Sequence, residues 1–545
     1  MRSKYAKVMR SRIFNIALLC LFVLCAGIYN YGLHRSFWPD HEYTVPIYRR
    51  FLKEFYGHNM DFSGFFNKVA YIPYRLFGCT IKALRVYAAL VYQIIILFST
   101  IAAIYSFERR RFEWYKLGIF AFIAVLLHPG SSLLCGSYYT NLHQYPYDMH
   151  VSVAVCATLS IMLMCIHQGI TERKYKNIMK VIILIVIAMG YNQGDFLYII
   201  GFVGPLICVG LMYLWREKRK LFFILPFGAI AALAFLHVLS FAMPALSSLF
   251  EHHSLYTGYE AGEVVGNIGF ADLGEIFNYI SNTTAELLAL FNIDISGKSM
   301  LAISTLFAGL RLILVIFIIT GSFRIVVNAI RKANYNQSLD SINIVLALGI
   351  LFNLFIVMFS RYGTGGYCIR YMTLILFYGA ILLARQSENI IVKLYGEIND
   401  RSKLYFFLFF SLAIVANMTT FWKMDDYVAD YETAIKNVSD YIIENNLGNG
   451  IGTPDCASLL TLAGEGTYAV VNCIVANEGI QYHIDGFDGV ATTFNYVVDW
   501  TEGVSGFDEE VVYRYFGAPD EIIERAGFVI YYYREGFSSQ WEQAQ

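Results

Sequence analysis

The feature that most constrains the fold of this chain is a series of apolar stretches, each long enough to cross a bilayer as a helix. A spanning helix needs roughly 20 residues, and we count about eleven such stretches. They lie at 13–33, 83–106, 117–135, 150–167, 179–192, 195–215, 221–243, 299–323, 341–360, 371–385 and 404–421. The chain is only 15% charged, whereas soluble domains average about 25%. This excludes a soluble enzyme, a disordered chain and a nucleic-acid-binding protein, and predicts an α-helical polytopic membrane protein.

Basic residues cluster in alternate connections between these stretches, the pattern that marks cytoplasmic loops. The clusters run from Arg2 to Arg12, Arg109 to Lys116, Arg173 to Lys180, Arg216 to Lys220, Arg324 to Lys332 and Arg385 to Lys403. Every cluster falls on one side if the number of spans is odd and the N-terminus is cytoplasmic. This predicts a membrane domain over 1–424 with outer loops at 34–82, 136–149, 244–298 and 361–370. We expect 13–33 to be a retained signal anchor rather than a cleaved signal peptide.

The C-terminal tail, residues 425–545, differs in kind from the rest of the chain. It holds 21 acidic residues against four basic ones. Helical spacing of apolar residues over 430–445 is combined with apolar runs at 468–476 and 528–533 that are typical of buried strands. We therefore predict a small acidic α/β domain on the outer side of the membrane. Cys456 and Cys473 are the two cysteines in this domain, and whether they form a disulfide stays open.

The first outer loop, 34–82, opens with two carboxylates, Asp40 and Glu42, directly after the first span. A helix is expected from Pro46, because proline suits a first helical turn. Its apolar residues, Ile47, Tyr48, Phe51, Leu52 and Phe55, share one face, and Arg49, Arg50, Lys53 and Glu54 share the other. This pattern is typical of an amphipathic helix that lies in the membrane surface with its basic face at the lipid headgroups.

Carboxylates beside a basic interfacial helix suit chemistry on a sugar that is linked to a lipid phosphate. Arginine binds phosphate through paired hydrogen bonds, so Arg49 and Arg50 are candidates for the donor phosphate. A carboxylate can take the proton of an acceptor hydroxyl as that hydroxyl attacks the sugar. Asp40 is our candidate for this general base, and Glu42 is the second candidate carboxylate. The alternative is that both are solvated loop residues that cap the following helix.

Two further polar segments could line a sugar site. The loop 136–149 is rich in aromatic and polar side chains and has no basic residue; its candidates for substrate binding are His143, Tyr145 and Asp148. Asp195 ends the polar run Tyr191–Asp195, which we expect to form a tight hairpin or a broken re-entrant unit between two spans. The alternatives are an interfacial aromatic belt and a solvated turn. No spacing of ligand residues predicts a metal site, although a shared divalent cation is not excluded.

A glycine-rich outer loop, 361–371, is flanked by Arg361 and Arg370. Glycines let backbone amides approach an anion closely, so both arginines are candidates for binding the donor phosphate. The loop lacks the Gly-Lys-Ser/Thr sequence of a P-loop, and a flexible linker with interfacial arginines is the alternative. Arg311 is another candidate for the phosphate if it lies within the membrane.

Together these features resemble the GT-C superfamily of integral membrane glycosyltransferases, in which an essential acid follows the first span. Asp40, in Trp38-Pro39-Asp40-His41-Glu42, matches that acid, although His41 separates it from Glu42. The short Tyr191–Gln193 turn, Arg370-Tyr371 and the helix at 430–445 resemble the type-II glucosyltransferases of bacterial O-antigen. The resemblance implies transfer of a sugar from a polyprenyl-phosphate donor to a cell-surface glycan, with Asp40 as base, at the bacterial plasma membrane.

Three other functions remain open at this point. A transporter usually places charge near the membrane midplane, within repeated halves, whereas charge here gathers at the outer loops and no repeat is visible. A polysaccharide polymerase or ligase would use similar lipid-linked substrates. A non-catalytic scaffold would use the C-terminal domain to bind a partner.

Overall fold

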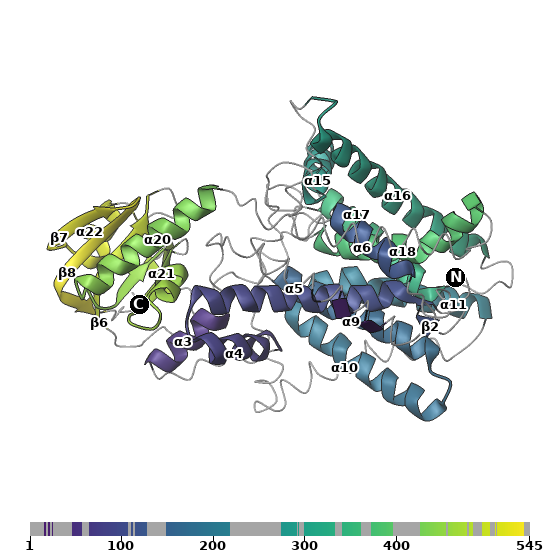
Figure 1. The fold of residues 1–545 in the computed structure, drawn as a ribbon, viewed down its shortest axis with the longest axis horizontal. Coiled ribbons are helices and arrows are strands. Elements are labelled where there is room, and N and C mark those ends of the chain that lie inside the picture. The colour runs from purple at the N-terminus through teal and green to yellow at the C-terminus, as the bar shows by residue number, and fades with distance from the viewer. Residues whose placement is uncertain are drawn as a thin grey trace, which may run out of the picture. The chain divides into compact units, whose positions relative to one another are not determined.

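The computed structural model describes residues 46–56, 65–106, 111–112, 115–127, 149–217, 274–291, 299–332, 340–360, 372–395, 426–453, 456–476, 479–482, 493–501, 507 and 509–538, with isolated residues at 16, 17, 20, 21, 24 and 293. The chain forms two compact units (Figure 1). The first comprises Met1–Gly32, Val91–His143 and Met149–Lys423, and the second comprises Leu33–Leu90, Gln144–Asp148 and Met424–Gln545. The segment after the first predicted span thus belongs to the same unit as the C-terminal tail.

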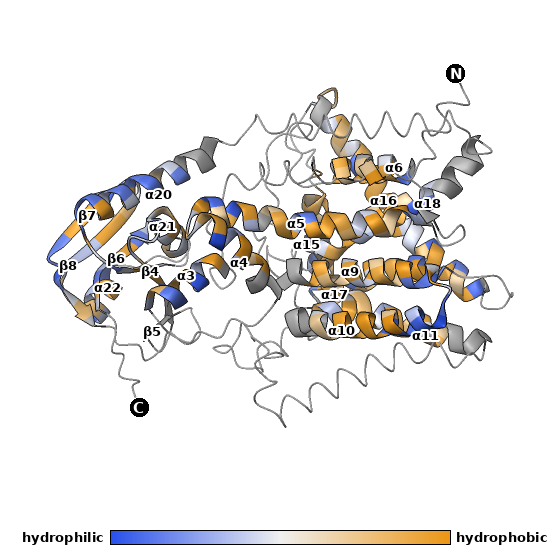
Figure 2. Ribbon diagram, turned by 60° about the horizontal axis from the view of Figure 1, so that its bottom comes forward, coloured by the Kyte–Doolittle hydropathy of each residue, from blue (hydrophilic) through white to orange (hydrophobic). Residues whose placement is uncertain are grey.

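The first unit is a bundle of apolar helices, coloured by hydropathy in Figure 2. Its elements are α5 (Ile81–Ile104, from Val91 onward), α6 (Tyr115–Leu127), α9 (Met149–Gly169), α10 (Arg173–Tyr198), the π-helix η2 (Ile199–Val203), α11 (Gly204–Glu217), α15 (Ile276–Leu290), α16 (Ile303–Lys332), α17 (Ser341–Phe359) and α18 (Thr373–Tyr395), with a hairpin of β1 (Tyr105–Ser106) and β2 (Arg111–Phe112). Among the described residues, three helical stretches are long and apolar enough to cross a membrane: Ile81–Ile104, Thr305–Arg331 and Ser341–Phe359. Three shorter apolar helices accompany them, Val153–Gly169, Ile199–Met212 and Thr373–Ser387.

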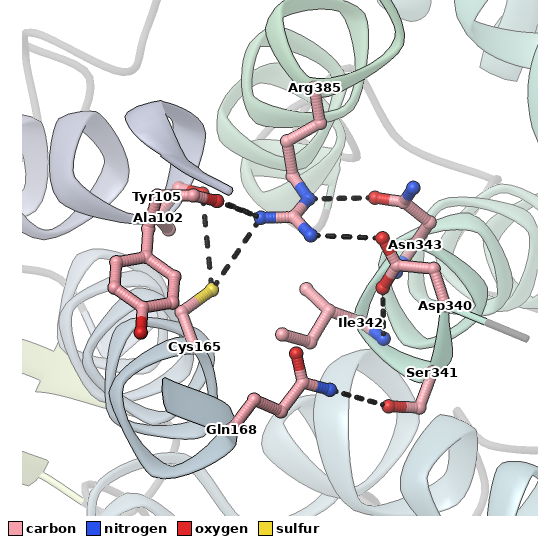
Figure 3. Close-up of polar contacts among 9 residues, drawn as sticks. All are labelled: Ala102, Tyr105, Cys165, Gln168, Asp340, Ser341, Ile342, Asn343 and Arg385. Atoms are coloured by element: carbon pink, nitrogen blue, oxygen red, sulfur yellow. Dashed lines mark hydrogen bonds and ion pairs between the residues drawn. The ribbon is translucent and has the colours of Figure 1, made fainter. Parts of the chain in front are cut away.

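The ends of three helices meet around one buried arginine, Arg385 of α18 (Figure 3). Its guanidinium donates to the carbonyl oxygens of Ala102 and Tyr105, both at 3.0 Å, where α5 ends. It also donates to Asn343 Oδ1 at 2.8 Å and forms an ion pair of 3.0 Å with Asp340, where α17 begins. The C-terminal end of α5 and the N-terminal end of α17 therefore lie close together around Arg385. The alternation of basic connections predicts these two helix ends on the same side of the membrane.

This arginine is nevertheless not the solvated loop residue that its place in a basic cluster suggests. α18 continues to Tyr395, ten residues beyond the predicted end of the span, so Arg385 lies inside the helix and is buried. Its Nη1 also lies 3.7 Å from the Cys165 sulfur near the end of α9. The buried guanidinium is stabilised because each of its hydrogen-bond donors shown here has an acceptor. The acceptors are two carbonyls at a helix C-terminus, a side-chain amide and a carboxylate.

The polar run Tyr191–Asp195 lies inside α10. Its backbone is therefore helical, and the expectation of a non-helical turn at these residues is wrong. The helix must still bend sharply there. Residues eight positions apart on a straight α-helix are separated by about 12 Å along the axis, yet a Cβ on Gly190 would lie 2.4 Å from the ring of Tyr198. The Tyr198 hydroxyl also lies 2.8 Å from Ser160 Oγ, in the middle of α9. The π-helix η2, a form that often marks local distortion, follows immediately.

The second unit contains a six-stranded sheet of order β5-β4-β3-β6-β8-β7. The strands are β3 (Gly450–Gly452), β4 (Val470–Ala476), β5 (Gly479–Tyr482), β6 (Thr493–Trp500), β7 (Glu521–Arg525) and β8 (Phe528–Ser538). β3 runs parallel to β4 and β6, and the other neighbours are antiparallel. The helices are α20 (Asp426–Glu444), α21 (Ala457–Ala463) and α22 (Glu509–Phe516). The helix and both strands that the sequence predicts in the tail are thus present.

The two cysteines of this sheet region are buried thiols. Cys456 and Cys473 are both buried and neither forms a disulfide, so the open question of a bridge is answered against it. Cys456 lies within 3.4 Å of Thr453 Oγ1, and Thr453 in turn donates to the buried carboxylate of Asp499 at 3.1 Å. The thiols are therefore part of the domain core.

Candidate functional site

The helix that follows Asp40 and Glu42 is α3 (Pro46–Tyr56). It is amphipathic, as predicted, but its apolar face does not lie against lipid. Ile47, Tyr48 and Leu52 are 0% exposed, because they pack within the same unit as the C-terminal sheet, beside α21. The expectation of a helix with its apolar face in the acyl region is therefore wrong. An amphipathic pattern shows that one face is covered and does not show whether lipid or protein covers it.

The contact between α3 and the sheet includes directional hydrogen bonds as well as apolar packing. The Tyr48 hydroxyl donates to the carbonyl oxygen of Val470 at 2.7 Å and accepts from the amide of Asn472 at 3.2 Å. The ring of Phe51 lies 3.7 Å from where a Cβ on Gly466 would be. The first turn of α3 is thereby fixed to the start of β4.

A second helix, α4 (Phe65–Phe77), is joined to α3 by a polar cluster. Arg50 forms an ion pair of 3.1 Å with Glu54 and places its guanidinium carbon 4.3 Å from the ring centre of Tyr71. Tyr74 donates to Glu54 at 2.8 Å. Burial and the neighbouring Glu54 carboxylate raise the pKa of Tyr74. Arg50, a candidate for phosphate binding, therefore already serves to hold the two helices together, which leaves part of its guanidinium for any further ligand.

The exposed face of α4 is both apolar and basic. Ile72 and Leu76 are 55% and 68% exposed, and between them Arg75 is exposed and donates to the Tyr71 hydroxyl at 2.6 Å. This hydrogen bond raises the pKa of Arg75. The chain then turns at Gly78, whose φ of 69° is the left-handed conformation that glycine adopts readily, and enters α5, a candidate membrane span.

The beginning of α5 is tied to the C-terminal domain by an ion pair. Arg85 of α5 contacts Glu432 of α20, and both belong to the second unit. Thr80 caps the helix by accepting from the amide of Ala83 at 3.1 Å. The loop helices and the C-terminal domain thus share contacts at both α3 and the start of α5.

Most of the candidate residues lie outside the described residues. These are Asp40, Glu42, His143, Tyr145, Asp148, Arg361 and Arg370. Arg49 lies on α3 and Asp195 on α10, but the positions of their side chains are not described. Arg50 and Arg311 are the candidates whose contacts are described. Among the described side chains, no group of three or more His, Cys, Asp and Glu residues could hold a metal ion.

Arg311 lies within the bundle, in the apolar stretch Thr305–Arg331 of α16, and is 0% exposed. Its Nε donates to the carbonyl oxygen of Leu126, at the end of α6. Ionisable side chains at such positions are costly in a bilayer and are usually kept for a function. Arg311 therefore stays a candidate for the donor phosphate.

No protein-family model and no curated protein matches the sequence. A comparison with solved structures finds the crystal structure of ArnT from Cupriavidus metallidurans bound to undecaprenyl phosphate, with a TM-score of 0.54 over 95% of this chain and 98% of that chain, at 11% sequence identity. This chain has the ArnT fold. The apo structure of the same ArnT is also found, with a TM-score of 0.40, 12% identity and coverage of 94% and 97%.

The fold shared with this ArnT fits the helical architecture with a C-terminal α/β domain that the sequence predicts. The described residues include three helices that are long and apolar enough to cross a membrane and three shorter apolar ones, as expected for a multi-pass membrane protein. The likeness extends over nearly the whole of both chains.

Proposed function

We propose that this protein is a membrane glycosyltransferase that moves a sugar from a polyprenyl-phosphate carrier to a surface-glycan acceptor. The observation that carries the proposal is the ArnT fold over 95% of the chain, together with the undecaprenyl phosphate that is bound to that ArnT. In our proposal the loops 34–82 and 136–149 and the C-terminal domain face the outer side of the bacterial plasma membrane. Within the GT-C superfamily we assign it to the type-II O-antigen glucosyltransferases, on the sequence features given above.

The donor would enter from the bilayer, with its phosphate at the membrane surface. The exposed face of α4 suits that surface, because Ile72 and Leu76 can contact acyl chains while Arg75 contacts headgroup phosphates. This gives α4 the role that the sequence predicts for α3. The donor phosphate itself is assigned to arginines: Arg361 and Arg370, with Arg49, Arg50 and the intramembrane Arg311 as further candidates.

The reaction is a single displacement. The acceptor hydroxyl oxygen attacks the anomeric carbon while Asp40 takes the hydroxyl proton. The bond between that carbon and the phosphate oxygen breaks, and polyprenyl phosphate leaves with the electron pair and with its charge held by arginine. Such a displacement inverts the anomeric centre. His143, Tyr145, Asp148 and Asp195 are assigned to the sugar and acceptor.

The test is mass spectrometry of surface glycans from cells that lack the protein and are complemented with wild type, Asp40→Asn or Glu42→Gln. Wild type should restore a hexose-sized mass, and Asp40→Asn should not, although it is produced at the same level. Glu42→Gln tests the second candidate carboxylate, two residues away. Equal restoration by Asp40→Asn would remove Asp40 as the base, and no glycan change with wild type would contradict the transferase itself.

A further inference from the structure

One carboxylate of the helical bundle, Glu286 of α15, lies half-buried beside an apolar helix. α15 packs against α17 (Figure 1), and α17 contains no charged or titratable residue. Within the part of the chain that the structure describes, Glu286 has no hydrogen-bond or ion-pair partner. Burial therefore raises the pKa of Glu286, and no described neighbour compensates for the lost hydration.

A second polar group without a partner lies on the same side of α15. Thr283 is three residues before Glu286, a spacing that places two side chains next to each other on a helix. Its hydroxyl is 0% exposed and has no hydrogen-bond partner among the described residues. Buried polar groups in proteins are almost always paired. The unpaired hydroxyl beside the unpaired carboxylate therefore indicates a position that a ligand completes.

The chemistry of this position suits hydroxyl groups better than a phosphate or a metal ion. α15 contains no basic residue to offset the repulsion between Glu286 and a phosphate. No group of three or more His, Cys, Asp and Glu residues among the described side chains could hold a metal ion. An ionised carboxylate accepts strong hydrogen bonds from hydroxyl groups. The exposed Asn282, four residues before Glu286 and thus next to it, can both donate and accept.

The place of α15 in the chain brings these groups close to the start of α16. α15 belongs to the expected outer loop 244–298 and ends at Leu290. Nine residues later, the carbonyl oxygen of Ser299 accepts from Thr305 in the first turn of α16 at 2.7 Å. The adjacent Met300 and Leu301 are 86% and 90% exposed, as suits apolar side chains that meet acyl chains at the membrane surface. The sugar of a lipid-linked substrate lies at this level.

We propose that Glu286 and Asn282 form a sugar-binding subsite, in which the carboxylate and the amide bind hydroxyl groups of a neutral sugar. This inference rests on the proposed function, which supplies sugars from two sources, the glycan acceptor and the lipid-linked donor. Both sources offer the same hydroxyl chemistry, so the experiment has an arm for each.

The experiment compares Glu286→Gln with Glu275→Gln in the full-length protein reconstituted in lipid nanodiscs. Glu275 is the matched control, because it is exposed, directly precedes the same helix and receives the same substitution. The assay follows transfer of radiolabelled glucose from undecaprenyl-phosphate glucose to glycan released from cells that lack the protein. Donor and acceptor are varied in turn.

We expect Glu286→Gln to raise the KM for one substrate about 10-fold, the order expected for loss of a hydrogen bond to a charged group. The KM for the other substrate and kcat should stay within about twofold, because a binding contact is lost and not a contact made only during the reaction. A higher acceptor KM assigns the subsite to the acceptor, and a higher donor KM assigns it to the donor sugar. Glu275→Gln should change neither value.

The pH dependence separates binding by the carboxylate from a structural role. Glu286 takes up a proton at a higher pH than an ordinary glutamate and then loses the charge that strengthens its hydrogen bonds. The kcat/KM for the affected substrate should therefore fall as the pH is lowered through this raised pKa. The fall should be absent in Glu286→Gln. Glu275 and Tyr279, the other titratable groups at α15, lie about three and two turns before Glu286, and Glu275→Gln should keep the fall.

Three results would overturn the inference: both KM values within twofold of wild type in Glu286→Gln, an equal effect of Glu275→Gln, or an unchanged fall at acid pH in Glu286→Gln. Failure of the proposed function is seen separately, as no transfer by wild type. Labelling of carboxylates with a carbodiimide and an amine then tests the subsite alone. The released glycan or the donor should protect Glu286 and not Glu275, and no protection by either would contradict the subsite.

Discussion

Replacing Arg385 by methionine should destabilise the helical bundle, and the structure allows the size of the effect to be worked out. The substitution keeps most of the side-chain volume but removes the ion pair to Asp340 and the donors for Ala102, Tyr105 and Asn343. Breaking a buried pair from one side costs about 3–5 kcal/mol. Asp340 is a third exposed and keeps some hydration, so we expect the lower end, about 3 kcal/mol. At about 2–4 °C per kcal/mol, Tm should fall by roughly 10 °C.

The assay is thermal unfolding in detergent, followed by a dye that becomes fluorescent on reaction with thiols. Cys165 lies against Arg385 and is buried, so its reaction reports opening at this cluster. Arg331→Met is the matched control, because Arg331 is an exposed arginine on α16, and its removal should cost less than about 0.5 kcal/mol.

A second variant separates the ion pair from the helix cap. Asp340 accepts from the amides of Ile342 and Asn343 at 3.1 and 3.3 Å, and asparagine caps helices about as well as aspartate. Asp340→Asn should therefore keep the helix cap but leave the buried Arg385 without its counter-charge, so it should destabilise the bundle as well. In the double variant no unpaired charge remains, so its cost should be less than the sum of the two single effects. The reasoning is refuted if Arg385→Met behaves like Arg331→Met, or if the double variant loses the sum of the two single effects.

Three further predictions concern other parts of the chain. Leu76→Glu places a negative charge on the exposed face of α4 and should lower sugar transfer about fivefold without changing Tm. The magnitude follows from roughly 1 kcal/mol per charge near anionic lipid. An unchanged rate in vesicles with anionic lipid would contradict a membrane role for this face. Gly349→Val should greatly reduce the yield of folded protein in size-exclusion chromatography, because a Cβ would lie 2.6 Å from the carbonyl oxygen of Gly201. Cys456 and Cys473 should react with a maleimide only after denaturation and equally with or without reductant, since both thiols are buried and form no disulfide. Protection that disappears on reduction would indicate a disulfide.

The sequence predicts the existence of elements better than their partners. The length of an apolar span is governed by the thickness of the hydrocarbon layer, so α5 and α17 can be predicted from their apolar stretches. Basic clusters mark one side of the membrane, so they also predict that the end of α5 and the start of α17 lie on the same side, where both contact Arg385. The burial of Arg385 does not follow, because its neighbours Asp340 and Ala102 are distant in sequence. The polar run at 191–195 indicates that the chain changes direction in α10. It does not predict that the backbone there stays helical, since glycine, asparagine and glutamine also suit a turn.

The case of α3 shows why the partner of an apolar face cannot be predicted from its own sequence. Lipid chains and a protein core both favour the burial of Ile47 and Leu52, so the helix carries the same pattern in either environment. Tyr48 holds the one distinguishing signal, because a hydroxyl at the centre of an apolar face needs a partner that acyl chains cannot offer. That partner is the backbone of β4, 422 residues away. The place of α3 on the C-terminal sheet is therefore set by two segments at opposite ends of the chain.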